Sequence, residues 1–271
     1  MQHKRILSVQ DISCVGQCSL TVALPLLSAL GHECAILPTS LLSSHTAFTH
    51  TSFLSLTDEV PAILDAWKQE HISFDALVAG YIGTSECLAL LPCIIEDFIE
   101  KDGKKIIDPV MGDGGVLYRH LDARYVRQMQ DVIAHADLIL PNLTEACLLS
   151  DIPYRESADQ DFLSELHETL TARGARTSVI TGVPTRHGRI GISVYDGEHA
   201  PFVYDTVHVD RPSHGAGDVF ASLVTGRVVS GMPLADAARM AADFTCRAIS
   251  ETPPSHWYGL SFERFMRLSE D

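Results

Sequence analysis

The sequence predicts an α/β protein with three layers, in which a mostly parallel central sheet lies between two layers of helices and carries antiparallel strands at its edge. Two observations support this prediction. Short runs rich in Val, Ile and Leu alternate with amphipathic stretches over most of the 271 residues, and parallel strands need such crossover helices. Further along, two alternating segments flank Asp196-Gly197, a pair that favours a hairpin and therefore an antiparallel edge.

The first half of the chain shows the alternation most clearly. We expect strands where short apolar runs stand between polar or glycine-containing turns, and helices where apolar residues recur with helical spacing. The expected strands are 5–9, 34–38, 75–82 and 104–108, and the expected helices are 19–30, 58–70 and 85–101.

The second half continues the alternation and then changes. The expected elements are a helix at 122–134, a strand at 137–141, helices near 144 and at 162–172, and a strand at 177–181. The antiparallel pair covers 188–209, and two helices follow at 217–230 and 234–249. Gly231-Met232-Pro233 separates these two helices, because glycine commonly follows a helix and proline commonly begins one.

Composition and charge restrict the class of protein. We expect one domain over residues 1–271, since 46% hydrophobic and 20% charged residues are typical of a globular chain. The formal net charge of -15 argues against binding to nucleic acid and to anionic membranes, whose phosphates attract basic surfaces, and favours a small-molecule partner. There is no run of about 18 apolar residues, and the seven scattered cysteines fit reduced thiols. We therefore expect a cytosolic (cytoplasmic) protein.

Polar residues gather just after the predicted parallel strands. In open α/β sheets, ligands bind beyond the carboxyl ends of the strands, so these residues predict a ligand-binding crevice. The chain has neither a GxGxxG nor a GxxxxGK[ST] motif, which argues against a dinucleotide fingerprint and a P-loop. The polar and turn residues after the strands are Asp11, the segment 39–46, Tyr81, Gly83, Asp108, Asn142, Glu145, Thr181 and Gly182.

The segment HGAGD, residues 214–218, leads into a predicted helix. Gly215, Ala216 and Gly217 have little or no side chain, so their N–H groups can approach a ligand, and a helix N-terminus carries about half a positive charge. This combination predicts an anion hole. Asp218 is either a common helix N-terminal acid or a base that takes a proton from an alcohol attacking a phosphoryl group.

Two further segments have both a structural and a functional interpretation. In NLTE, residues 142–145, Asn142 and Glu145 are spaced to organise a hydrated magnesium ion or to form a helix capping box. Asp108 in IDPVMGDGG stands before a proline and a glycine-rich stretch that could act as a lid, whereas an isolated strand-end Asp is usually a turn former. Together with Asp218, these residues favour a phosphate and cation site.

From its first strand to its last helix, the chain resembles the ribokinase-like superfamily of small-molecule kinases, and within it the pyridoxal kinase branch. HGAGDVFAS, IDPVMGDGG and LPNLTE are specific to the superfamily, whereas SSHT and GYIG point to the narrower branch. The matching segments are ILSVQD, LSSHT at 42–46, AGYIG at 79–83, IDPVMGDGG at 107–115, LPNLTE at 140–145, VITG at 179–182 and HGAGDVFAS at 214–222.

The resemblance implies transfer of the ATP γ-phosphate to the 5′-hydroxymethyl group of pyridoxal, pyridoxamine or pyridoxine. It implies that Asp218 is the catalytic base, with Gly215, Ala216 and Gly217 as the anion hole. It also implies ATP and Mg²⁺ as cofactors, leaves a monovalent cation such as K⁺ open, and implies a homodimer. The remaining implied roles are an ATP site at Asp108, Asn142, Glu145, Thr181 and Gly182, a Mg²⁺ site at Asp108 and, through water, Glu145, and a vitamer pocket at Asp11, Thr46 and Tyr81.

The chain departs from the family pattern at two of these positions. Asp11 stands where better-known pyridoxal kinases have a serine against the ring, and Thr181 stands where a lysine is common. A carboxylate at residue 11 pairs with a protonated pyridine nitrogen or an amine, which favours pyridoxamine or indicates another substrate.

Two alternatives to a vitamin B6 kinase remain. Hydroxymethylpyrimidine kinases are close relatives with a similar flat substrate, and a related branch has cysteine in place of Asp218. A non-catalytic carrier or sensor of the vitamer or the nucleotide would be expected to lack the base or the anion hole, and this sequence has both.

Overall fold

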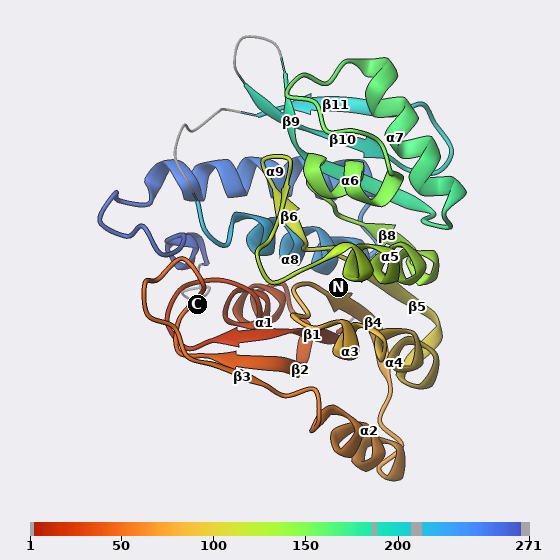
Figure 1. Ribbon diagram of the computed structural model, residues 1–271, viewed down its shortest axis with the longest axis vertical. Coiled ribbons are helices and arrows are strands. Elements are labelled where there is room, and N and C mark those ends of the chain that lie inside the picture. The colour runs from red at the N-terminus through yellow and green to blue at the C-terminus, as the bar shows by residue number, and fades with distance from the viewer. Residues whose placement is uncertain (1–2, 186–188, 207–212, 267–271) are drawn as a thin grey trace.

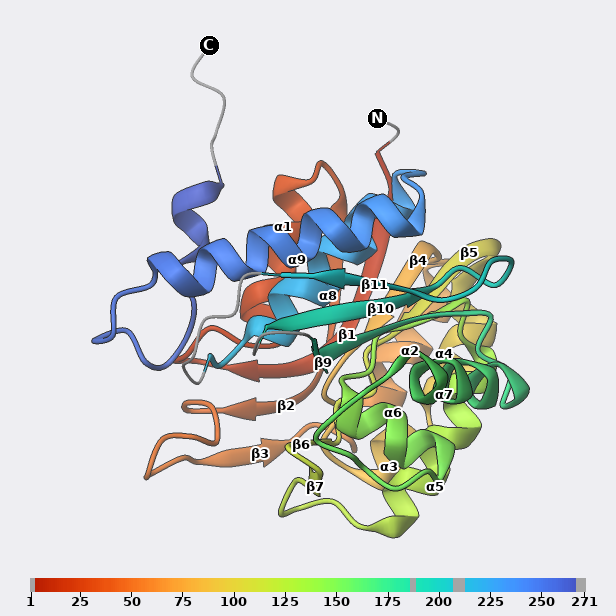
Figure 2. The same cartoon turned by 90° about the horizontal axis from the view of Figure 1, so that it is seen from above.

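The computed structural model describes residues 3–185, 189–206 and 213–266. Its centre is a nine-stranded sheet with the strand order β11-β10-β9-β8-β5-β4-β1-β2-β3. Helices cover both faces of this sheet (Figure 1), and the view from above places α1, α8 and α9 on one face and α2 to α7 on the other (Figure 2). The three-layer α/β fold predicted from the sequence is therefore confirmed.

Most strands of the sheet run parallel. β1 pairs with β2 and β4, β4 with β5, β5 with β8, and β8 with β9, all in parallel. The edges are antiparallel, because β3 pairs with β2 and the β10–β11 hairpin pairs with β9. The sheet strands are β1 (Arg5–Ser13), β2 (Glu33–Leu42), β3 (Phe53–Ser55), β4 (Phe74–Ala79), β5 (Ile99–Ile107), β8 (Leu138–Ile139), β9 (Thr177–Pro184), β10 (Ile190–Tyr195) and β11 (Phe202–Asp205).

The helices connect the parallel strands and cover the sheet. Short 3₁₀ turns lie at Ile133–His135 and Phe262–Phe265, and a separate hairpin consists of β6 (Gly112–Asp113) and β7 (Val116–Leu117). The helices are α1 (Leu20–Ala29), α2 (Val60–Gln69), α3 (Ser85–Leu88), α4 (Leu91–Phe98), α5 (Ala123–Val132), α6 (Leu143–Ser150), α7 (Gln160–Ala172), α8 (Ala216–Val229) and α9 (Leu234–Glu251).

Two hydrophobic cores hold the layers together. Successive residues of a strand point to opposite faces, so Ile6 packs with α1, α8 and α9 while Leu7 packs with the helices of the other face. Ala76 and Leu77 of β4 divide in the same way. Because both faces are covered, β4 is continuously apolar from Ala76 to Ala79, which is the pattern that predicted it.

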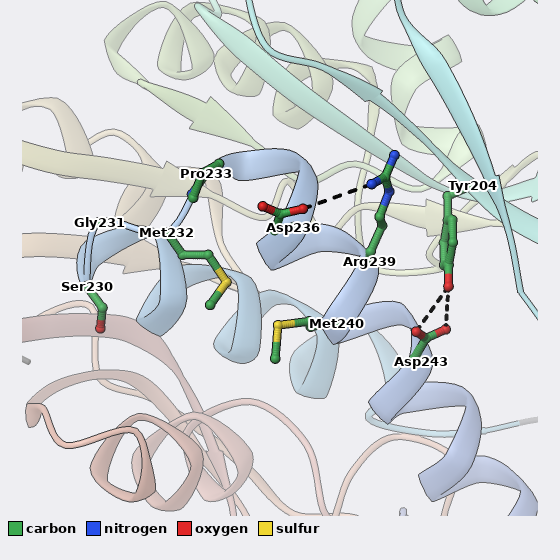
Figure 3. A pocket seen from close by; sticks show the side chains of 9 residues that line it. All are labelled: Tyr204, Ser230, Gly231, Met232, Pro233, Asp236, Arg239, Met240 and Asp243. Carbon is green, nitrogen blue, oxygen red and sulfur yellow. Dashed lines mark hydrogen bonds and ion pairs between the residues drawn. The ribbon is translucent and has the colours of Figure 1, made fainter.

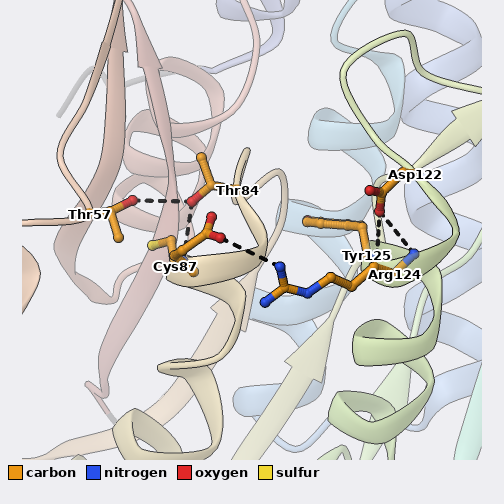
Figure 4. A network of polar contacts seen from close by, with 7 residues as sticks. Thr57, Thr84, Cys87, Asp122, Arg124 and Tyr125 are labelled. Carbon is orange, nitrogen blue, oxygen red and sulfur yellow. Dashed lines mark hydrogen bonds and ion pairs between the residues drawn. The ribbon is translucent and has the colours of Figure 1, made fainter.

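The helix predicted over 85–101 is wrong in its extent. The chain forms two helices, α3 and α4, and β5 already begins at Ile99. Thr84 accepts a hydrogen bond from the N–H of Cys87 at 3.1 Å and so caps α3, and Thr57 lies 3.1 Å from the same hydroxyl (Figure 4). Pro92 stands in the first turn of α4, where a proline is favourable, and it prevents one continuous helix.

Other boundaries also differ from the sequence prediction. β1 and β2 continue past the expected ends, so residues 10–13 and 39–42 are strand and not loop. The short strand β3 and the β6–β7 hairpin were not predicted. The hairpin predicted over 188–209 is confirmed for β10 and β11, with Gly197 at φ 88° between them, whereas residues 188 and 207–209 lie outside the described part.

Among the described residues, no helix is long and apolar enough to span a bilayer.

A buried histidine joins α7 to the sheet. The ring nitrogens of His167 lie 2.7 Å from Ser178 Oγ on β9 and 2.8 Å from Ser193 Oγ on β10. Burial lowers the pKa of His167 to about 4, so the imidazole is neutral in the folded protein at neutral pH.

We expect His167 to make the folded state sensitive to mild acid. The unfolded chain binds this proton near pH 6.5 and the folded chain only near pH 4, so stability is lost as the pH falls between these values, by up to about 3 kcal/mol. His167→Gln should remove this dependence. Urea titrations measure the free energy of unfolding of this variant and of the wild type, and the difference between the two should be smaller at pH 5 than at pH 7. His120→Gln, at an exposed position, is the control. If the difference in the free energy of unfolding between His167→Gln and wild type stays constant from pH 7 to pH 5, the conclusion that His167 is buried in its neutral form is contradicted.

Candidate active site

The segment HGAGD begins α8 at the carboxyl end of the sheet. Gly215 is the N-cap residue, with φ 79° and ψ 2°. A Cβ atom here would lie 1.9 Å from the carbonyl oxygen of Gln17, so only glycine fits against the loop that follows β1. A Cβ on Gly217 would have no atom within 4 Å, so this part of the backbone is open to a ligand, and the N-terminus of a helix attracts an anion.

Asp218 lies in the first turn of α8, as the sequence predicts. The residue as a whole is half-buried, and protein atoms shield its carboxyl group from water. This burial raises the pKa of Asp218 to about 7, with the negative charge of Asp11 adding to the rise and the N–H of Ser19 opposing it. A carboxyl group with such a pKa is suited to accept a proton at neutral pH.

Asp11 is close to Asp218 but does not lie in a loop, which corrects the sequence prediction. It is part of β1, whose pairing with β2 shifts register between Gln10 and Ile12. The Asp11 side chain is buried, the hydroxyl of Ser13 lies 3.3 Å from its Oδ2, and its N–H donates to the carbonyl of Tyr81 at 3.2 Å. Burial raises the pKa of Asp11, although the hydroxyl groups of Ser19 and Ser13 stabilise the anion.

Asn142 and Glu145 form the capping box that the sequence allowed. Asn142 Oδ1 accepts from the N–H of Glu145 at 2.9 Å, and Glu145 Oε2 accepts from the N–H of Asn142 at 2.8 Å. The same side chains bind the glycine-rich stretch: Glu145 Oε1 accepts from the N–H of Met111 at 3.0 Å, and Asn142 Nδ2 donates to the carbonyl of Gly112 at 2.8 Å. The box therefore also fixes the segment that carries Asp108 and the β6–β7 hairpin.

Asp108 follows β5 directly and is buried beside two other carboxyl groups. Burial raises its pKa well above the usual range, and the charges of Glu145 and Asp218 raise it further. Burial also raises the pKa of Glu145, to about 8. Asp108 is thus within electrostatic range of Glu145 in α6 and of Asp218 in α8.

The strand end at Thr181 and Gly182 lies beside Asn142. Thr181 donates its N–H to the carbonyl of Pro141 at 2.9 Å and forms a parallel bridge with Asn142. Gly182 is exposed, with φ 68°. The predicted nucleotide-contacting residues are therefore adjacent to the predicted phosphate site.

The charge of this group of residues is unbalanced. Among the described residues, no lysine or arginine is a cause of the pKa shifts of Asp11, Asp108, Glu145 and Asp218. Oxygen donors of this kind suit Mg²⁺. However, the described part of the chain contains no group of three or more His, Cys, Asp or Glu side chains that could hold a metal ion. These carboxylates fit a cation that is held jointly with phosphate and water.

Tyr81 and Thr46, the predicted vitamer contacts, differ in their surroundings. Tyr81 lies partly buried near Asp11, and burial together with that charge raises the pKa of its hydroxyl. Thr46 is exposed, and its hydroxyl has no hydrogen bond to another residue within the described ranges. The structure therefore brings Tyr81, but not the side chain of Thr46, into contact with the other site residues.

The residue before Thr46 makes the contacts instead. His45 is buried, and its Nε2 lies 2.9 Å from the carbonyl oxygen of Tyr258. Its ring centroid is 4.9 Å from Phe48 and 4.8 Å from His214, the first residue of HGAGD. Sequence reasoning missed His45 and His214, because only the fold brings these segments together with the C-terminal loop around Tyr258.

Tyr118, just after β7, is a third residue that sequence reasoning missed. The residue is partly exposed, but burial of its hydroxyl end raises the pKa of the hydroxyl, and the charges of Glu145, Asp113, Asp108 and Asp218 raise it further. The hydroxyl is thus within electrostatic range of these carboxylates. The motif IDPVMGDGG ends before this residue, so its pattern gave no signal.

A surface hollow lies elsewhere on the molecule. It is lined by residues around the α8–α9 turn, among them Ser230, Met232 and Met240 (Figure 3). Asp218 and Ser230 stand at opposite ends of α8, and a helix rises about 1.5 Å per residue. The hollow is therefore separate from the group around Asp218.

Comparisons with known proteins agree with the geometry. The family model for phosphomethylpyrimidine kinase matches residues 24–259. Pyridoxine kinase from Bacillus subtilis is 31% identical over 84% of this chain and 83% of its own length.

Two solved structures superimpose closely. One is a protein of the phosphomethylpyrimidine kinase type from Bacteroides thetaiotaomicron crystallised with pyridoxal, with a TM-score of 0.93, 34% identity and coverage of 98% of this chain and 95% of that chain. The other is pyridoxal kinase from Lactobacillus plantarum, with a TM-score of 0.90, 31% identity and coverage of 98% and 96%. The chain therefore belongs to the phosphomethylpyrimidine kinase family within the ribokinase-like superfamily, as its motifs predict.

Proposed function

We propose that the protein is an ATP-dependent kinase that phosphorylates the 5′-hydroxymethyl group of a vitamin B6 vitamer, namely pyridoxal, pyridoxamine or pyridoxine. The observation that carries this proposal is the position of Asp218, in the first turn of a helix that begins with Gly215. A base and a set of anion-binding N–H groups thus occur together, which is what transfer of a phosphoryl group to an alcohol requires.

Asp218 takes the proton of the attacking hydroxyl group. Its pKa of about 7 keeps a substantial fraction of the side chain ionised at neutral pH and makes that fraction a better base than an ordinary aspartate. The N–H groups of Gly215, Ala216 and Gly217 face the transferred phosphoryl group, whose developing charge the positive end of the α8 dipole stabilises.

Asp108, Asn142, Glu145, Thr181 and Gly182 form the nucleotide side of the site. Mg²⁺ supplies charge neutralisation for the ATP phosphates when it is bound. Asp108, and Glu145 through water, are the residues that would hold this ion. No lysine or arginine among the described residues balances the charge of these two carboxyl groups, so they fit a cation. Asn142 acts indirectly, because its amide is occupied by the N–H of Glu145 and the carbonyl of Gly112.

Asp11 and Tyr81 border the vitamer, whereas Thr46, the third residue predicted there, is exposed in the loop between β2 and β3. Asp11 is a buried carboxylate without a cationic partner among the described residues. A substrate with a positive charge next to it, such as the amine of pyridoxamine, would compensate this charge. The relatives named for pyridoxine and pyridoxal support the same substrate class.

A hydroxymethylpyrimidine kinase is the second candidate function. The observation that favours it is the matching family model, which describes a phosphomethylpyrimidine kinase. The substrates of both activities are flat heterocycles with a hydroxymethyl group, so the phosphoryl-transfer residues would be the same. A non-catalytic vitamer-binding protein is a weaker candidate, because the chain keeps Asp218, the proposed base, and the glycine-containing helix start proposed as the anion hole.

We also propose that the protein forms a homodimer. The edge strand β3 exposes Phe53 and Leu54, and Val15 and Leu41 nearby in the fold are exposed as well. An unpaired, apolar sheet edge is normally covered, and a second copy of the chain would cover it.

Asp218→Asn should lower kcat by about 10²–10⁴-fold, because the amide cannot take up the proton. Thermal stability and ATP binding should persist, since the substitution hardly changes volume. The measurement is steady-state phosphorylation with Mg²⁺, compared with Asp131→Asn on the exposed surface of α5. Full activity of Asp218→Asn would remove the base assignment.

Assays with pyridoxal, pyridoxamine, pyridoxine and hydroxymethylpyrimidine should give the highest kcat/KM with one of the three vitamers. The physical reason is the charge of Asp11, which prefers a protonated pyridine nitrogen or amine. Phosphorylated product is measured under the same ATP and Mg²⁺ conditions. A preference for the pyrimidine would replace the first function with the second.

Leu54→Lys should convert the dimer to a monomer, because a charge at the centre of an apolar interface is costly to desolvate. Sedimentation velocity measures the change. Met240→Lys, at an exposed methionine of α9, is the control and should stay dimeric. A wild-type protein that sediments as a monomer would rule out the dimer.

A further inference from the structure

The loop between β1 and α1 packs against the start of α8. A Cβ built on Gly215 would lie 1.9 Å from the carbonyl oxygen of Gln17 and 3.7 Å from the Cα of Cys18. Gly215 is the N-cap residue of α8 and the first of the three residues proposed as the anion hole. The backbone at Gln17 therefore limits where the backbone of Gly215 can lie.

Gln17 is bonded to the C-terminal segment of the chain. This segment turns back after α9 toward the end of β1 (Figure 2). The amide oxygen of Gln17 lies 2.6 Å from Nε2 of His256, and its amide nitrogen donates to the carboxylate of Glu263. Its main-chain N–H donates to the carbonyl of Tyr258 at 3.3 Å. Both amide atoms of one half-buried side chain are thus used to join two segments that are distant in the sequence.

The C-terminal segment is itself firmly anchored. The hydroxyl of Thr252 accepts from the N–H of Ser261 at 2.9 Å, which closes the loop between these residues. Leu260 in this loop is completely buried. A Cβ on Gly259 would lie 2.5 Å from the amide oxygen of Gln17 and 2.7 Å from its Cβ, so the loop also packs tightly on the same side chain. Gln17 is therefore held from a rigid support.

We propose that Gln17 is a positioning residue for phosphoryl transfer: its bonds to His256 and Glu263 hold the β1–α1 loop against Gly215 and so keep the N–H groups at the start of α8 directed at the transferred phosphoryl group. This role rests on the proposed kinase function. It differs from a purely structural role, because its loss should lower kcat far more than it lowers the thermal stability or the affinity for the substrates.

The first test is Gln17→Met, studied in the full-length protein with its best vitamer, ATP and Mg²⁺. Methionine has a similar length and keeps the packing, but it loses both side-chain hydrogen bonds. We expect kcat to fall about 10- to 100-fold, because small misplacements of groups around a reacting centre are costly. KM for both substrates should change much less, since the anion hole acts mainly on charge that develops in the transition state. The thermal midpoint should stay within a few degrees of wild type.

The second test exchanges two side chains. Gln17→Glu alone places a carboxylate beside that of Glu263, and we expect a low kcat because like charges repel. Combining Gln17→Glu with Glu263→Gln again pairs a donor with an acceptor, and the new carboxylate still accepts from His256. This double variant should therefore recover most of the wild-type kcat.

Gln160→Met is the matched control. The Gln160 side chain donates to the carbonyl of Pro201 at 2.9 Å and so also joins two segments of the chain. Pro201 lies in the connection between β10 and β11, which is next to the start of β9 and so at the opposite end of that strand from the site. The same loss of a glutamine hydrogen bond at this position should leave kcat unchanged.

Each outcome decides the role of Gln17. Wild-type kcat in Gln17→Met would overturn the positioning role and leave the kinase function intact. A fall in kcat that is matched by a large fall in the thermal midpoint, or that the exchange of residues 17 and 263 does not reverse, would overturn it as well. If the wild-type protein phosphorylates none of the compounds, the kinase function fails and the role of Gln17 fails with it.

Discussion

The crowding of carboxyl groups at one edge of the sheet is the constraint to which the rest of this structure responds. Asp11, Asp108, Glu145 and Asp218 come from four separate segments, and burial raises the pKa of each. Burying like charges together opposes folding. Such an arrangement is stable only if hydrophobic packing elsewhere compensates for it, and it is useful only if a cation or a proton arrives with the ligand.

The fold meets this cost in two ways. Two hydrophobic cores, one on each face of the sheet, pack residues such as Leu77 and Val78 almost completely out of contact with water. Backbone N–H groups also point at one of these acids, because those of Asn142 and Met111 both donate to Glu145. Main-chain donors stabilise the anions without adding a competing positive charge, so the site remains attractive to external cations.

The sequence was sufficient to predict the layers and the edge of the sheet that carries the site, because both follow from local periodicity. The strand at 5–9 and the hairpin turn at Asp196-Gly197 depend on neighbouring residues alone. Tertiary contacts decided the rest. Asp11 was predicted in a loop, but pairing with β2 extends β1 through it, and the hydroxyl of Thr46 was predicted in the pocket, but His45 takes the buried position in that loop. Tyr118 gave no sequence signal, since its place within electrostatic range of these carboxyl groups appears only in the fold.

The two interpretations of NLTE turn out to be compatible. A capping box needs Asn142 and Glu145 to bond to each other's N–H groups, and these bonds are present. Glu145 still accepts from Met111, and Asn142 still donates to Gly112, so the cap holds the segment that begins with Asp108. A helix start built in this way sets the position of a buried acid and of the hairpin together. The same residue pattern therefore serves as a structural cap and as support for a phosphate site, and spacing alone cannot separate the two roles.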